Sequence, residues 1–157
     1  MNLREGLKED GPALIELVDG VYREYGDQIF LEGADADLLD IEAAYQRRGG
    51  AFVVLEEGNT IIGSHATLPL DRDKGLLTFR RLYLRKDYRG RRVGHQLMTW
   101  ALEWARDNAF QRVEFWSDVR FGRAHRFFEA MGFEKGEVRQ MEDGFMPYEE
   151  FHFARNV

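Results

Sequence analysis

The residues best suited to bind an anion lie in one segment, where a predicted strand ends and a predicted helix begins. Seven lysines and arginines lie from Arg80 to Arg92 against the single acid Asp87, although the whole chain carries a net charge of −6. A loop that enters a helix presents backbone N–H groups without partners, and these groups together with the helix dipole favour an anion. Gly90 and Gly94 let the backbone approach a phosphate closely. The segment therefore predicts a pyrophosphate site, with a solvated basic turn as the alternative.

The composition narrows the classes of function. One compact cationic segment in an acidic chain favours a localised anionic ligand over a nucleic-acid track, which needs a basic face across the domain. The segment lacks both the Gly-Lys-Ser/Thr of a P-loop and the Gly-x-Gly-x-x-Gly of a Rossmann fold, which disfavours nucleotide hydrolases and dehydrogenases. The chain has no cysteine and its four histidines show no ligand spacing, so we predict no metal site. We find no signal peptide and no membrane-length apolar run, and we expect a cytoplasmic protein without a membrane partner.

The elements that position this segment follow from hydrophobic periodicity and from turn residues. We expect strands over 2–7, 51–56, 60–70, 76–84, 111–117, 133–140 and 147–154, and helices after Asp10 and over 36–48, 92–108 and 121–131. A helix joins the strands 76–84 and 111–117, so these two strands should lie parallel, while the other neighbours should be antiparallel. The sequence thus predicts an α/β fold with a mixed sheet and flanking helices, in one domain over residues 1–157.

Two motifs resemble those of a known family. Tyr88-Arg89-Gly90-Arg91-Arg92-Val93-Gly94 resembles the pyrophosphate loop of the GNAT superfamily of acyl-CoA N-acyltransferases, Arg/Gln-x-x-Gly-x-Gly/Ala. Arg92 replaces the usual middle glycine, and we expect position 92 to point outward with an ordinary helical backbone. Downstream, Ala124-His125-Arg126-Phe127-Phe128-Glu129-Ala130-Met131-Gly132-Phe133 is similar to the family's Ala-x-x-(Leu/Phe)-Tyr-Glu-x-x-Gly-Phe segment. The two motifs stand in the family's order, with a helix and a strand between them.

The resemblance implies a fold, a cofactor and a reaction. It implies a GNAT-like, mostly antiparallel sheet in which the two parallel strands splay apart to admit the pantetheine arm of acetyl-CoA. The acetyl group would pass to the amine of a small molecule or peptide by direct attack, without a metal. The backbone of Leu82 and Leu84 would bind pantetheine, and the amides from Arg89 to His95 would hold pyrophosphate. The implied cofactor-binding set is Leu82, Tyr83, Leu84, Arg89, Gly90, Arg91, Arg92, Val93, Gly94, His95 and Phe128.

The sequence specifies the catalytic groups less fully than the cofactor-binding residues. The family usually has a tyrosine at the position of Phe128, where it protonates the leaving thiolate, and phenylalanine has no proton to give. Candidate substitutes are Tyr83, Tyr148 and His125. For the base, strand alternation puts Glu114, Trp116 and Asp118 on one face, and Asp118 lies at the end of the strand where ligands gather. A turn or N-cap role is the alternative for Asp118.

The sequence does not identify the acceptor amine. Arg80 and Arg81 are expected on opposite sides of their strand, where one of them would bind a carboxylate of the acceptor; the alternative is a salt bridge to acidic neighbours. An acidic loop contains Asp27, Glu32, Asp35 and Asp37. These acids would favour a cationic amine as acceptor; the alternative is that they serve only solubility. An acyl-CoA-binding module without catalysis and a nucleic-acid binder are the competing functions. A homodimer is expected only by analogy.

Overall fold

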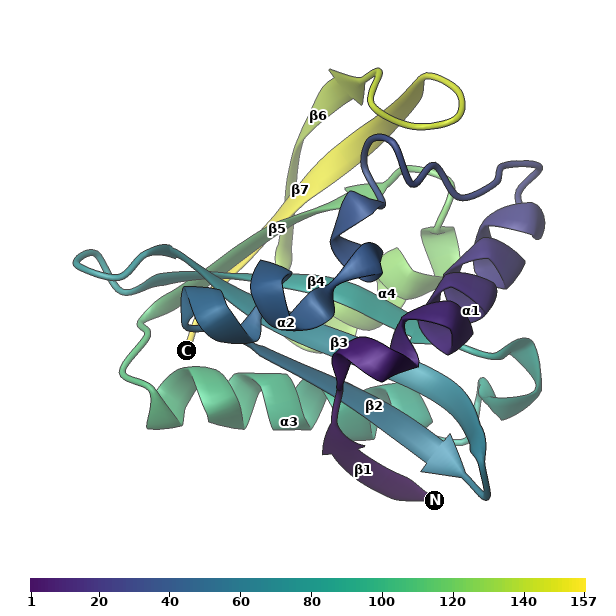
Figure 1. The fold of residues 1–157 in the computed structure, drawn as a ribbon. Helices are drawn as coiled ribbons and strands as arrows, with labels where there is room; N and C mark the ends of the chain where they lie inside the picture. The colour runs from purple at the N-terminus through teal and green to yellow at the C-terminus, as the bar shows by residue number, and fades with distance from the viewer.

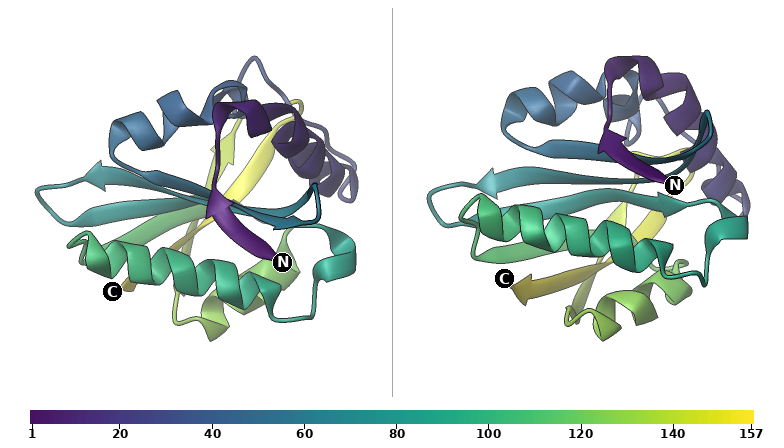
Figure 2. Two further views of the ribbon diagram at one scale, coloured as in Figure 1. Left: turned by 60° about the horizontal axis from the view of Figure 1, so that its bottom comes forward. Right: turned by 90° about the horizontal axis from the view of Figure 1, so that it is seen from below.

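A seven-stranded sheet with helices on both faces forms the protein, as the computed structural model of residues 1–157 shows (Figures 1 and 2). The strand order is β1-β2-β3-β4-β5-β7-β6, and only the pair β4·β5 is parallel. The strands are β1 (Asn2–Glu5), β2 (Ala51–Glu57), β3 (Thr60–Asp71), β4 (Leu76–Leu84), β5 (Arg112–Asp118), β6 (Glu134–Met141) and β7 (Tyr148–Asn156). This arrangement confirms the predicted mixed, mostly antiparallel fold.

The helices divide between the two faces of the sheet. They are α1 (Gly11–Arg23), α2 (Ile41–Ala44), α3 (Val93–Asp107) and α4 (Gly122–Ala130), with short 3₁₀ turns at Lys8–Asp10, Ala36–Leu39, Gln46–Arg48 and Lys86–Tyr88. We call the two sides the α1 face, which α1 and α2 cover, and the α3 face, which α3 and α4 cover (Figure 2). None of the helices combines the length and the apolar character that a bilayer crossing requires.

Apolar side chains pack on both faces of the sheet. On the α1 face, Leu14 and Val18 of α1 pack with Phe52 of β2. On the α3 face, Met98 of α3 and Phe128 of α4 pack with side chains of β4, β5 and β7. Burial of such side chains, each worth about 1.5–3 kcal/mol, fixes which way the central strands face and therefore which side chains remain near the centre of the sheet.

The parallel strands β4 and β5 part soon after they begin. They pair only at Leu76↔Arg112 and Leu77↔Val113, although each strand continues for several further residues. The backbone edges of β4 and β5 that face each other therefore have no strand partner beyond this point. The predicted splaying of the two strands is confirmed.

The segment 36–48 is not the continuous helix that we expected. It consists of a 3₁₀ turn, the four-residue α2 and a second 3₁₀ turn. Asp40 interrupts it, because its φ of −155° and ψ of 86° are not helical and its side chain accepts a hydrogen bond from the N–H of Ala43. Aspartate competes for backbone donors in this way and begins a new helix rather than continuing one.

Candidate active site

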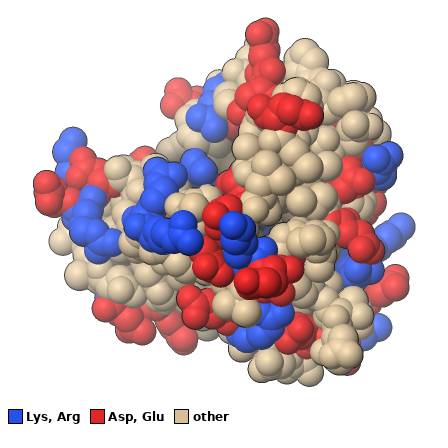
Figure 3. Space-filling model, viewed as in Figure 1, with Lys and Arg blue, Asp and Glu red and all other residues tan.

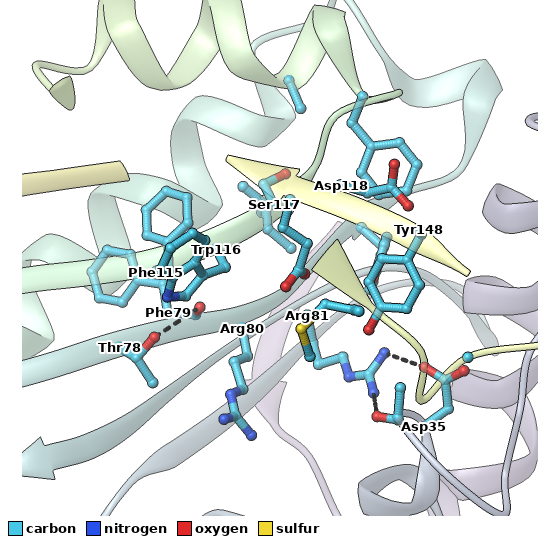
Figure 4. Close-up of a pocket in the computed structure, with 18 of the residues that line it drawn as sticks. Asp35, Thr78, Phe79, Arg80, Arg81, Phe115, Trp116, Ser117, Asp118 and Tyr148 are labelled. Atoms are coloured by element: carbon cyan, nitrogen blue, oxygen red, sulfur yellow. Dashed lines mark hydrogen bonds and ion pairs between the residues drawn. The ribbon is translucent and has the colours of Figure 1, made fainter. Parts of the chain in front are cut away.

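A cavity of about 500 Å³ lies where β4 and β5 separate. Met98 and Phe128, which belong to the cluster on the α3 face, line it together with Tyr22, which packs on the α1 face. The cavity therefore reaches both sides of the sheet. Its wall also includes residues of the β6–β7 hairpin, as the close-up in Figure 4 shows for Tyr148. Charged side chains of both signs gather around the middle of the α1 face (Figure 3).

The loop between β4 and α3 presents free backbone donors at the open end of this split. None of the N–H groups of residues 90–95 donates a hydrogen bond within the chain. Gly90 has a φ of +80°, a conformation that favours glycine, and a Cβ added at Gly94 would make ordinary van der Waals contact with Phe127 at 3.9 Å. Free amides at the start of a 15-residue helix form an anion-binding arrangement, and the residues fit a pyrophosphate.

Two arginines of this loop differ from expectation. The N–H of Arg89 donates to the carbonyl of Lys86, and its guanidinium binds both carboxylate oxygens of Glu24 at 2.6 and 2.8 Å and also the carbonyl of Leu84. Arg89 therefore ties the loop to α1, and its amide is not free. Arg92 does not have the expected helical backbone, because it has a φ of +62° and caps α3 in the left-handed region. An arginine thus adopts the conformation that a glycine would adopt there more easily.

Arg81 lies at a bulge in β4. Its φ is +60°, and the β3·β4 register shifts between Ser64 and Ala66, so two residues of β4 face one residue of β3. The bulge breaks the alternation that would have separated the two arginines, and Arg80 and Arg81 both line the cavity, contrary to expectation (Figure 4).

The Arg81 side chain is only 8% exposed and sits in a network of hydrogen bonds. All its N–H donors have acceptors: the carboxylates of Asp35 and Asp37, the hydroxyl of Tyr22 and the carbonyl of Ala34. Burial raises the pKa of Asp37, but the charge and the hydrogen bonds of Arg81 outweigh burial and hold that pKa below its usual value. Arg81 is thus engaged with acidic neighbours, whereas the exposed Arg80 makes no ion pair and no hydrogen bond.

The side chains considered as proton donors have different surroundings. Phe128 is buried among Phe115 and Phe153. Tyr83 shares a hydrogen bond with Tyr22, and burial raises its pKa. Tyr148 donates to Asp143 on the exposed hairpin. His125 is buried, its Nε2 lies 3.1 Å from Ser117 Oγ, and burial lowers its pKa.

The carboxylate of Asp118 lines the cavity and is occupied by an arginine. Both its oxygens accept hydrogen bonds from the side chain of Arg120, at 3.0 and 2.6 Å, and Oδ1 also accepts the backbone N–H of Arg120. Arg120 extends further to Asp27 at 2.7 Å. Asp118 therefore has the turn contact anticipated as its alternative role.

The sequence analysis missed Glu150, which pairs across the sheet with Asp118 and lines the same cavity. The alternation Tyr148, Glu150, His152 along the last strand was the available signal.

Comparison with known proteins agrees with this geometry. The profile of the acetyltransferase (GNAT) family matches residues 16–133. The chain belongs to the GNAT acetyltransferase family. An aminoalkylphosphonate N-acetyltransferase of Salmonella typhimurium is 26% identical to this GNAT protein over 140 residues, which is 87% of each chain.

Solved acetyltransferases share the fold of this GNAT protein. An acetyltransferase from Streptococcus agalactiae superposes with a TM-score of 0.85 at 23% identity, over 99% of this chain and 98% of the other. A GNAT superfamily phosphinothricin acetyltransferase from Sinorhizobium meliloti, solved in complex with acetyl-CoA, has a TM-score of 0.77 at 16% identity, over 99% and 88% of the two chains.

We predict that Arg81→Ala destabilises this GNAT protein by about 3–5 kcal/mol at neutral pH, because it leaves the buried Asp35 and the half-buried Asp37 without their cationic partner. The free energy of unfolding in urea measures the loss. Arg80→Ala is the matched control and should change that free energy by less than about 0.5 kcal/mol. Equal losses for the two variants would contradict the network.

The stability difference between wild type and Arg81→Ala should also depend on pH. The pKa of Asp37 is depressed in the folded protein, so its contribution is present above the unfolded value of about 3.9 and is lost as the pH falls through the folded value. The gap between wild type and variant should narrow in that acidic range. Urea unfolding at several pH values measures it, and a gap that widens with acid would contradict the assignment.

Proposed function

We propose that the protein transfers the acetyl group of acetyl-CoA to an amine of a small molecule or peptide. The observation that carries this proposal is the set of free N–H groups over residues 90–95, placed at the open end of the split between β4 and β5. Membership of the family and the acetyl-CoA complex of the solved phosphinothricin acetyltransferase support it.

The chain's own groups suit each part of the donor. The amides of residues 90–95 would bind pyrophosphate, while Arg91 and Arg92, which make no ion pair, would add charge. The unpaired edge of β4 around Leu82, Tyr83 and Leu84 would hydrogen-bond the pantetheine amides as a neighbouring strand does. Phe128 would pack against the arm. In this proposal Arg89 shapes the loop through Glu24 rather than contacting phosphate.

The acceptor amine would enter from the α1 face and attack the acetyl carbon directly. The amine nitrogen forms its bond to the acetyl carbon as the carbon–sulfur bond breaks, and sulfur leaves with the electron pair. The chain supplies orientation, removal of the amine proton and protonation of the thiolate. Asp118 and Tyr83, proposed for these proton transfers from the sequence, both contact other protein groups.

We propose that Arg80 binds an anionic group of the acceptor. It lines the cavity, is exposed and has no ion-pair partner, whereas Arg81 is saturated by Asp35 and Asp37. An aminoalkylphosphonate carries both an amine and an anion, and an N-acetyltransferase acting on such molecules is a relative of this chain. An acceptor with both groups suits a cavity that contains carboxylates and one free arginine.

An acyl-CoA-binding module is the second candidate, because Phe128 stands where the family has a tyrosine. A panel of 2-aminoethylphosphonate, alanine, spermidine and an alanine-terminated peptide separates the two functions. Thiol release from acetyl-CoA that depends on one of these amines supports the transferase. Tight acetyl-CoA binding with no such release supports the binding module.

We predict that Gly94→Leu weakens acetyl-CoA binding at least about tenfold, equivalent to about 1.4 kcal/mol, because the new side chain covers the free amides. Titration calorimetry measures the affinity. Gly20→Leu on α1 is the control, since a Cβ added at Gly20 would meet no atom within 4 Å, and this variant should leave binding unchanged. Unaltered affinity in folded Gly94→Leu would remove the phosphate-loop assignment.

We expect Arg80→Ala to raise KM for 2-aminoethylphosphonate about tenfold or more while leaving KM for acetyl-CoA unchanged, because only the acceptor loses a charge-assisted hydrogen bond. Steady-state kinetics with each substrate varied in turn measures both constants. The control is Arg106→Ala, in the last turn of α3. A rise in KM for acetyl-CoA alone would contradict the assignment of Arg80 to the acceptor.

A further inference from the structure

We propose that Glu150 is the general base that takes the proton from the acceptor amine, an inference that rests on the proposed function. Glu150 lies on β7 and pairs in register with Asp118 at the end of β5. Its neighbours Phe151 and Phe153 pack into the cluster on the α3 face, so strand alternation directs Glu150 to the α1 face, where the acceptor would enter.

The position of Glu150 along the sheet matches that of the β4 bulge. The last paired residues of the split strands are Leu77 and Val113, and Asp118 lies five residues beyond Val113, as Leu82 lies five residues beyond Leu77. By this count Glu150, which pairs with Asp118, lies about level with the β4 bulge, beyond the point where the two strands separate. Both carboxylates line the cavity there.

One oxygen of the Glu150 carboxylate is free to accept a proton. Oε1 accepts hydrogen bonds from Nε and Nη2 of Arg139 at 2.9 and 2.7 Å. Oε2 makes no hydrogen bond in the chain and retains accessible surface, and Glu150 lines the cavity. The side chain is 15% exposed, so it is largely shielded from bulk water while its second oxygen remains reachable.

The other acids of the cavity are less suited to the task. Arg81 pairs with Asp35 and Asp37, and Arg120 pairs with Asp118 and Asp27. Both oxygens of each of these carboxylates already accept hydrogen bonds. The remaining two acids are Glu114, which pairs with Arg112, and Asp143, which lies exposed on the hairpin and accepts from Tyr148. Oε2 of Glu114 makes no hydrogen bond either, but it lies 3.9 Å from Nε2 of His152 and its side chain is 30% exposed, against 15% for Glu150. Glu150 therefore combines the stronger shielding with an unoccupied carboxylate oxygen.

Burial and the charged groups around Glu150 together favour proton uptake compared with an ordinary glutamate. Burial raises its pKa; Arg139 on β6 lowers it, and Asp118 on β5 together with Asp143 in the hairpin raise it again, so that the net pKa lies above the ordinary value. Tyr148, two residues away on β7, is the remaining titratable neighbour, and its own pKa is raised, chiefly by burial, so it stays neutral. A base is most effective when its pKa approaches the working pH.

The proton transfer balances without an added reagent. The acceptor arrives as an ammonium ion and gives one proton to Oε2 of Glu150, which leaves a neutral nitrogen with a lone pair. That lone pair forms the bond to the acetyl carbon, and the carbon–sulfur electron pair departs with sulfur. The acylated nitrogen gives its second proton to the leaving thiolate, which yields the amide and the CoA thiol, and Glu150 returns the first proton to solvent.

The test compares Glu150→Gln with Glu149→Gln, a change at the adjacent exposed residue. Wild type should have a pH-independent kcat/KM for 2-aminoethylphosphonate between the pKa of Glu150 and that of the amine. Glu150→Gln should fall about 10²-fold or more near neutral pH, and its rate should rise tenfold per pH unit as the neutral amine becomes available. Glu149→Gln should behave as wild type. Activity of Glu150→Gln equal to wild type, with the same profile, overturns the proposal.

A second variant distinguishes a general base from a residue that only positions Arg139. Arg139→Gln removes the positive charge that lowers the pKa of Glu150, so the acidic limb of the profile should move to higher pH while activity persists above it. If Glu150 served only to position Arg139, the two variants would lose the same activity without a shift of that limb, and the proposal would fail.

A direct titration gives a readout that does not depend on turnover. Carbon-13 NMR of glutamate-labelled protein identifies the Glu150 carboxyl as the resonance that Glu150→Gln removes. Its midpoint should lie above the ordinary glutamate value of about 4.3. A midpoint at or below that value overturns the assignment of Glu150. Absence of acetyl transfer by wild type to any amine of the panel would instead count against the proposed function.

Discussion

The separation of β4 from β5 after only two paired residues is the constraint on which the rest of the site depends. Two parallel strands that lie side by side normally satisfy each other's backbone groups, and here those groups remain available along an open edge. The same separation makes room for the cavity and brings the start of α3 to its open end. The loop before α3 and the cavity, whose wall includes Glu150 of β7, thus both lie along this separation.

The β4 bulge and its buried arginine, Arg81, lie in the wall of the cavity between β4 and β5. Arg81 adopts a left-handed backbone conformation, and its guanidinium joins the 3₁₀ turn at Ala36–Leu39 to α1 through Asp35, Asp37 and Tyr22. Such buried ion pairs contribute little net stability compared with apolar packing, yet they allow only one arrangement of their partners. We interpret the network as the element that holds the acceptor side of the cavity in register with β4.

Much of the fold could be predicted because it follows from local patterns. Helix α3, the hairpin of β2 and β3, and the parallel relation of β4 to β5 all follow from periodicity and connection length. The basic loop before Val93 was also recognisable, because its glycines and charges are local features.

The remaining features of the site depend on contacts between residues that are distant in sequence. The bulge at Arg81 breaks strand alternation, and the types of the neighbouring residues do not predict it. Arg89 was expected at phosphate, but Glu24, which is 65 residues away, binds it instead. The free oxygen of Glu150 can be recognised only once β6, β7 and Arg139 are in place.

The most direct test of the account is a titration of the labelled protein with CoA, followed by the backbone amide resonances in two-dimensional NMR. The account predicts that the amides of residues 90–95 and those of Leu82 to Leu84 shift together and saturate at one CoA per chain. Saturable shifts confined to other segments, with these amides unmoved, would contradict it.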